Sequence, residues 1–175
     1  VYGSGKEYDD YYINQMTELL TNYGDIYTFW MDGACGEGPN GKKQVYDWDR
    51  YYAKVRDLQP EAVLSISGPD VRWCGNEAGI VRKSEWSVVS KTMTSPVLTA
   101  KLSQQEDSEE FRERAIDPTK EDLGSREVLE NEPELAWFPA ETDLSIRPGW
   151  FYHPEEDDKV RSLENLKDVY LKSVG

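Results

Sequence analysis

Two successive units of helix, strand and loop in the first 80 residues constrain the fold more than any other feature of this sequence. Apolar side chains recur at helical spacing and predict a helix over about residues 7–23, which ends at Gly24, and another that ends near Pro60. Each helix is followed by a short apolar run, residues 25–31 and 62–67, of the kind that forms a buried strand. The helical stripes are Tyr12, Met16, Leu19 and Tyr23, then Val45, Trp48, Tyr52 and Val55. This alternation is typical of βα units around a parallel sheet.

The second half of the chain has weaker signals. Residues 91–133 are rich in charge and interrupted by proline, so we expect only loops and surface helices there. A third strand is predicted over residues 135–141, followed by an aromatic loop at 148–154 and a helix at about 157–173. One side of that helix carries Leu163, Leu166, Tyr170 and Val174. The acidic run 155–158 is interpreted as the solvated start of this helix, because acidic side chains are favoured there and the spacing of a calcium loop is missing.

Composition excludes several classes of function. The net charge of −14 leaves no stripe of Lys and Arg that could bind nucleic acid. No run approaches the roughly 20 apolar residues of a membrane span, and the polar N-terminus is unlike a signal peptide. Cys35 and Cys74 are expected to be free thiols near the core, and His153 is the single histidine, so we expect no metal and no cofactor. Carboxylates remain to carry any chemistry.

Acidic residues stand at the predicted strand ends. Asp32 directly follows the first strand, Glu77 lies in the loop after the second, and Glu141 ends the third. Loops at this edge of a parallel βα barrel build active sites, and two carboxylates about 5–5.5 Å apart suit a retaining glycosidase. Trp30 and Trp73 are close enough in sequence to desolvate one of them, but the sequence leaves open which one.

Taken alone, the same residues also have ordinary structural explanations. An Asp-Gly pair after a strand is usually only a turn. Trp30, Trp48 and Trp137 are more often core residues than platforms for a sugar ring. More specific evidence is needed, and it comes from longer phrases of the sequence.

These longer phrases, taken together, resemble family 29 of the glycoside hydrolases, the α-L-fucosidases. The phrases before residue 80 are Tyr8-Asp9-Asp10-Tyr11-Tyr12, Asn22-Tyr23-Gly24, Phe29-Trp30-Met31-Asp32-Gly33-Ala34, and Asp70-Val71-Arg72-Trp73-Cys74-Gly75-Asn76-Glu77-Ala78-Gly79. The later phrases are Glu85-Trp86, Trp137-Phe138-Pro139-Ala140-Glu141, and Ser145-Ile146-Arg147-Pro148-Gly149-Trp150-Phe151-Tyr152-His153. The later phrases, with the one around Glu77, are similar to the subgroup that prefers α-1,3- and α-1,4-linked fucose.

The resemblance implies roles for particular residues. Asp32 matches the nucleophile and Glu77 the general acid/base, separated by 77 − 32 = 45 residues. Glu141 and Trp150 match positions that line the sugar or the adjoining subsite, and Trp73 is expected to bind substrate beside them. The implied reaction releases fucose from fucosylated glycans with retention of configuration, through a covalent glycosyl-enzyme and without a metal or organic cofactor.

The resemblance also implies a fold and a setting. It predicts an α/β chain in which residues 1–175 form part of a catalytic (β/α)8 TIM-like barrel that lacks the first strands, because a complete barrel takes about 250 residues. We expect such a piece to be unstable and inactive without the N-terminal half of the same barrel. The family is commonly secreted or periplasmic, which is the expected compartment here.

Other interpretations stay open at this level. A non-catalytic sugar-binding remnant would be expected to have lost Asp32 or Glu77, and both are present. A retaining glycosidase for another sugar would fit the paired carboxylates equally well. A purely structural role has only the acidic surface in its favour.

Overall fold

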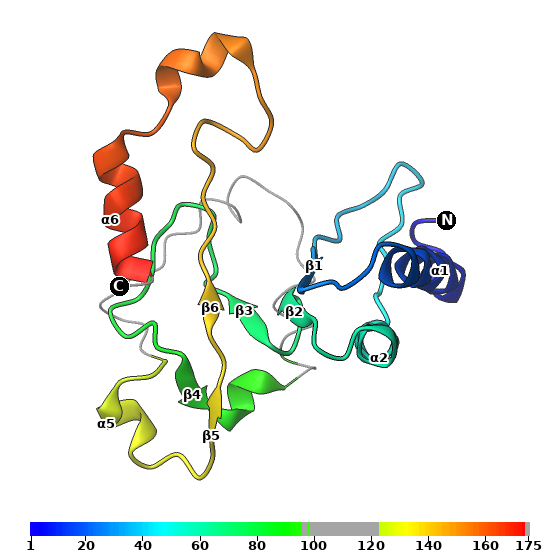
Figure 1. Ribbon diagram of the computed structural model, residues 1–175, viewed down its shortest axis with the longest axis horizontal. Helices are drawn as coiled ribbons and strands as arrows, with labels where there is room; N and C mark the ends of the chain where they lie inside the picture. Colours follow the sequence, from blue (N-terminus) through cyan, green and yellow to red (C-terminus); the bar gives the residue numbers. More distant parts are fainter. Residues whose placement is uncertain (96–97, 99–122, 174–175) are drawn as a thin grey trace.

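A sheet of four parallel strands, in the order β1-β2-β3-β6, occupies the centre of the computed structural model, which describes residues 1–95, 98 and 123–173 (Figure 1). The strands are β1 (Thr28–Met31), β2 (Val63–Ile66), β3 (Val71–Trp73) and β6 (Ala140–Glu141). In register, Met31 lies beside Ile66, Ile66 beside Arg72, and Trp73 beside Glu141. Because all pairs are parallel, the four strands end at one edge of the sheet.

Helices α1 (Lys6–Asn22) and α2 (Trp48–Leu58), both predicted from their helical stripes, pack together beside β1, whereas α6 (Leu163–Ser173) lies on the opposite side beyond β6 (Figure 1). The side chain of Asp47 caps α2 by accepting from the Arg50 amide. The core between α1, α2 and the sheet consists of Met16, Leu20, Met31, Trp48, Tyr51, Tyr52, Val55, Ala62 and Leu64.

The predicted stripes need small corrections. On α1 the side chain of Leu20 is buried, whereas Leu19 and Tyr23 are exposed. Beside α2, Val45 is exposed and Tyr51 is buried in its place. On α1, helical spacing allows either Leu19 or Leu20 to face inward, and the contact with α2 decides between them; Val45 is exposed because it precedes the first turn of α2.

The third predicted strand is wrong as a single element. Residues 135–141 form two strands with different partners: β5 (Leu135–Trp137), which pairs antiparallel with β4 (Val88–Ser90), and β6, which pairs parallel with β3. The change of partner occurs at Phe138 and Pro139. The Phe138 amide bonds to the Ser87 carbonyl at 2.6 Å, whereas proline has no N–H and its carbonyl instead accepts from the Arg72 amide at 3.0 Å.

The sequence places residues 71–73 in the loop after the second strand, but they form strand β3. Arg72 and Trp73 therefore lie on a strand, and Glu77 follows β3 instead of β2. A three-residue strand is too short to show periodicity, and it follows the turn at Gly68. A Cβ on Gly68 would approach the Leu64 carbonyl carbon to 2.4 Å, so the tight return from β2 needs glycine.

The C-terminal helix begins later than predicted. The acidic run lies in the 3-10 helix η2 (Pro154–Lys159), and α6 begins only at Leu163. Leu163 and Tyr170 are exposed, Val169 is the buried residue of α6, and Val174 lies outside the described residues. Within 91–133 the described elements are η1 (Lys91–Thr94) and α5 (Arg126–Leu129), as expected of surface helices, and residues 96–97 and 99–122 lie outside the description.

The structure settles three simpler expectations. Cys35 and Cys74 are buried thiols, as predicted. Trp48 is a core residue, but Trp30 and Trp137 are exposed in this chain, so that prediction is wrong for both. Within residues 1–95, 98 and 123–173, no helix combines the length and apolar character that a membrane span needs. The described strands establish a mixed α/β fold with a parallel sheet, and a partial (β/α)8 barrel stays a prediction.

Candidate functional site

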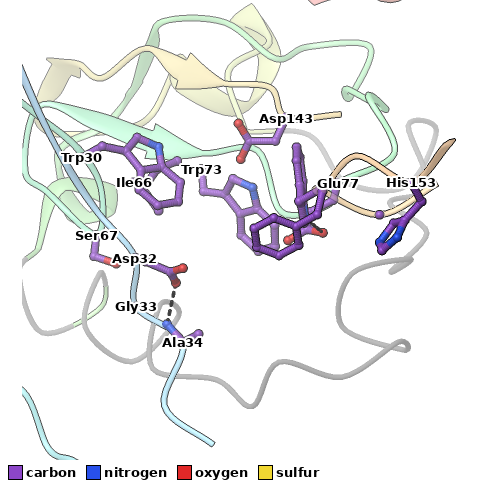
Figure 2. A pocket seen from close by; sticks show the side chains of 13 residues that line it. Trp30, Asp32, Gly33, Ala34, Ile66, Ser67, Trp73, Glu77, Asp143 and His153 are labelled. Carbon is purple, nitrogen blue, oxygen red and sulfur yellow. Dashed lines mark hydrogen bonds between the residues drawn. The ribbon is translucent and has the colours of Figure 1, made fainter. Parts of the chain in front are cut away.

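A cavity of about 420 Å³ opens at the carboxyl ends of the parallel strands (Figure 2). Two of the predicted acids, Asp32 and Glu77, line it, and so do the predicted substrate-binding residues Trp73 and Trp150. Glu141 is the one predicted site residue that does not contribute to the wall. The other lining residues are Trp30, Gly33, Ala34, Ile66, Ser67, Asp143, Gly149, Phe151 and His153.

Asp32 is positioned by the turn that ends β1. Its neighbours Met31 and Gly33 are buried, whereas the Asp32 side chain is exposed toward the cavity. The carboxylate Oδ1 accepts from the Ala34 amide at 2.9 Å (Figure 2). This local bond orients one oxygen and leaves the other available to a bound molecule.

Glu77 is held by its own loop and by the aromatic loop that carries Trp150. The Asn76 side chain is fully buried, and its Oδ1 accepts from the Ala78 amide at 2.8 Å and the Ile80 amide at 3.2 Å. Asn76 Nδ2 also donates to the Ile80 carbonyl at 2.7 Å, which closes the loop around Glu77. From the aromatic loop, Trp150 Nε1 donates to Glu77 Oε2 at 3.0 Å. The indole thus fixes the carboxyl of Glu77 in the cavity wall.

A buried ion-pair network lies under the same loop. Glu85 pairs with Arg72 of β3 and, at 2.9 Å, with Arg82. Arg82 also donates to the Cys74 carbonyl at 2.9 Å, and Arg72 donates to the Phe138 and Trp86 carbonyls. Burial by itself would raise the pKa of Glu85, but the two guanidinium groups outweigh it and lower the pKa. The network ties the loop that carries Glu77 to β3 and to the start of β6.

Asp143 is a cavity-lining acid that sequence reasoning missed. It lies two residues after β6 and its carboxyl faces the cavity near Trp73 (Figure 2). Burial raises the pKa of Asp143 to about 7, with further contributions from a hydrogen bond and repulsion from Glu141 and from the charge of Glu77. An indole hydrogen bond from Trp73 acts in the opposite direction. The signal available in the sequence was its place just after a strand end, the same criterion that selected Asp32.

Glu141 supports the wall from behind. Its Oε1 accepts from Trp30 Nε1 at 2.8 Å, a contact between the two outer strands of the parallel sheet. Three indole N–H groups therefore each donate a hydrogen bond to one carboxyl: Trp30 to Glu141, Trp73 to Asp143 and Trp150 to Glu77.

The end of β2 completes the wall and is strained. Ile66 has a φ of 66°, a left-handed conformation that is an outlier for a β-branched residue and costs on the order of 1–3 kcal/mol. Next to it, the fully buried hydroxyl of Ser67 has no hydrogen-bond partner within the described parts of the chain. Strain and unpaired polar groups of this kind cluster at functional sites.

The cavity offers carboxyl chemistry between aromatic walls. In the described ranges, no group of three or more His, Cys, Asp or Glu side chains is arranged to hold a metal ion. Exposed Asp32 and the firmly held Glu77 enter the same space from two different strands, which is an arrangement suited to acid, base or nucleophilic attack on one bound molecule.

No protein-family model matches the chain, but individual proteins and solved structures do. α-L-Fucosidase 1 of Arabidopsis thaliana is 40% identical over 175 residues, which is 99% of this chain and 29% of the relative. A solved structure of a candidate α-L-fucosidase from Bacteroides ovatus is 50% identical with a TM-score of 0.75, covering 99% of this chain and 29% of that one. A glycoside hydrolase 29 family member from a rumen bacterium is 35% identical with a TM-score of 0.66, over 97% and 28%.

The chain therefore spans a little under a third of the length of each of these relatives. Along nearly its whole length, it is homologous to a segment of the glycoside hydrolase family 29 α-L-fucosidases.

Proposed function

We propose that the protein carrying this chain is a retaining α-L-fucosidase in which Asp32 is the nucleophile and Glu77 the general acid/base. The observation that carries the proposal is that both carboxyl groups line one cavity at the ends of parallel strands, between tryptophan side chains. The homology to α-L-fucosidases supports fucose as the sugar. Because the chain matches less than a third of the length of these relatives, we propose that other parts of the protein help to build the site.

In the first step, an oxygen of Asp32 attacks the anomeric carbon of fucose while Glu77 donates its proton to the departing glycosidic oxygen. The carbon–oxygen bond to the leaving sugar breaks and an ester to Asp32 forms. In the second step, Glu77 takes a proton from water, which attacks the same carbon and releases Asp32. Two inversions give net retention of configuration.

Each held side chain has a purpose in this scheme. The Ala34 amide orients the Asp32 carboxylate for attack, and Trp150 orients Glu77 toward the leaving oxygen. Trp73 and Trp150 offer ring faces for the apolar side of a sugar. The phrase around Glu77 supports fucosylated glycans with α-1,3 or α-1,4 linkages as the substrate class. We also propose that the parallel sheet belongs to a (β/α)8 barrel, since the site lies at the carboxyl ends of its strands.

The first test is fucose release by the protein expressed from its complete gene. We expect Asp32→Ala to lower kcat by roughly 10⁴-fold or more, because the covalent route is lost. Added azide should restore turnover of an aryl α-L-fucoside and give the β-configured fucosyl azide. Asp25→Ala, an exposed acid just before the same strand, is the matched control and should retain activity.

We expect Glu77→Ala to lower kcat by about 10²–10⁴-fold on a fucosylated oligosaccharide. The loss should be much smaller on an aryl fucoside whose leaving group is an acidic phenol, because that leaving group needs little protonation. A folded complete protein that releases no fucose from any fucoside would refute the proposed activity. Full activity of Asp32→Ala would refute the assignment of the nucleophile alone.

A further inference from the structure

We propose that Asp143 determines specificity by hydrogen-bonding the sugar on the leaving-group side of the scissile bond. This inference rests on the proposed function of the same cavity, since it uses Asp32 and Glu77 to define the two sides. It adds a residue that contacts substrate but takes no part in breaking the bond.

The strand order places Asp143 on that side. Along the sheet edge, Asp32 follows β1, Glu77 follows β3 and Asp143 follows β6, the strand that pairs with β3. A nucleophile and a proton donor flank the scissile bond, so fucose lies toward Asp32 and the leaving sugar toward Glu77. Asp143 follows the strand next to that of Glu77 and lines the same cavity.

Asp143 is also rigidly linked to Glu77 through the backbone. The Gly79 amide donates to the Asp143 carbonyl at 3.2 Å, and Ala78 and Leu144 form an antiparallel bridge. The two loops therefore move together, so a sugar bound by Asp143 would be held in register with the proton donor. Positioning of this kind raises the rate only when it is rigid on the scale of the reacting atoms.

The carboxyl of Asp143 is oriented by its neighbours without being neutralised by them. Burial has the largest effect on its pKa, followed by Glu141, the indole of Trp73 and Glu77, and none of these three neighbours is a cation. Trp30 fixes Glu141 in turn, at 2.8 Å. A half-buried acid held against another acid is an expensive arrangement for structure alone, and such arrangements concentrate at functional sites.

The protonation state of Asp143 suits a sugar hydroxyl. Because burial and the adjacent carboxylates raise its pKa to about 7, the protonated and the ionised form are both populated near neutral pH. It can then donate a hydrogen bond as well as accept one, and a hydroxyl group can do both. An ordinary surface aspartate at this pH could only accept.

Kinetics with two leaving groups separate this role from a structural one. In the complete protein, we expect Asp143→Ala to lower kcat/KM for a fucosylated trisaccharide by roughly tenfold or more, mainly through KM, which is the effect of losing one buried hydrogen bond. For 4-nitrophenyl α-L-fucoside, whose leaving group has no hydroxyls, kcat/KM should change by less than about threefold. Asp143→Asn, which keeps a donor and an acceptor, should lie between wild type and the alanine variant.

Asp158→Ala removes an exposed acid that does not line the cavity and should match wild type on both substrates. Inhibition by the defucosylated disaccharide gives a second measurement, and its Ki should rise in both Asp143 variants, so that Asp143→Asn decides if the alanine variant does not fold. Equal losses on the two substrates, or no loss on either, would overturn the inference while the fucosidase activity stands. Wild-type protein that is inactive on both substrates would overturn the proposed function and this inference with it.

Discussion

The indole N–H of Trp150 donates to the carboxyl of Glu77 at 3.0 Å, which makes Trp150 the residue best suited to test how the proposed proton donor is oriented. Trp150→Phe keeps an aromatic ring in the cavity wall but removes the donor. We expect kcat/KM for a fucosylated oligosaccharide to fall by about tenfold, because one hydrogen bond to an acid that must be well aligned is lost.

The matched control is Trp86→Phe, since Trp86 is similarly exposed but contributes nothing to the cavity wall. Steady-state kinetics on the two variants make the comparison. Unchanged kinetics in Trp150→Phe would mean that the carboxyl of Glu77 is aligned by the Asn76 loop alone.

The packing of α6 against the Glu77 loop decides stability at the scale of elements. Gly79 has a φ of +72°, and a Cβ there would lie 2.9 Å from Val169 Cγ1 of α6. We expect Gly79→Ala to cost about 1–2 kcal/mol for the left-handed backbone and a further 1–3 kcal/mol for the overlap, seen as a lower Tm and a lower denaturant midpoint.

Gly149→Ala separates the two costs, because Gly149 also has positive φ but no atom within 4 Å of its added Cβ. Its loss should be limited to the backbone contribution. An equal loss in both variants would show that α6 withdraws from Gly79 without penalty.

Asp143 should shape the pH dependence of stability for the whole molecule. Its folded pKa, about 7, lies above the roughly 3.9 of an unfolded aspartate, so the folded state binds more protons between these values. Stability contributed by this group is therefore complete below about pH 4 and is lost as pH rises to about 7. Glu85 acts with the opposite sign, because its lowered pKa adds stability above the unfolded value, which is lost in acid.

Thermal denaturation of wild type and Asp143→Asn at pH 5 and pH 8 tests this balance. The variant cannot ionise, so its Tm relative to wild type should be higher at pH 8 than at pH 5. The same difference in Tm at both pH values would contradict the prediction.

Much of the fold could be predicted because its signals are local. Helical stripes and two apolar runs were enough to place α1, β1, α2 and β2, and the phrases around Asp32 and Glu77 were enough to select two acids that share a cavity. The failures occurred where a partner distant in sequence makes the decision. Residues 135–141 are one apolar run, yet β4 and β3 divide it into two strands.

The sequence by itself determined the alternation of helix and strand and the acids that follow strand ends, because propensity, spacing and turn residues act within a few positions of the chain. Only the tertiary structure decided that Leu20 is buried instead of Leu19, that β6 lies beside β3, and that Asp143 faces the cavity. Burial and charge–charge repulsion depend on distance in space. The high pKa of Asp143 arises from residues on three different segments, and no local pattern records that they meet.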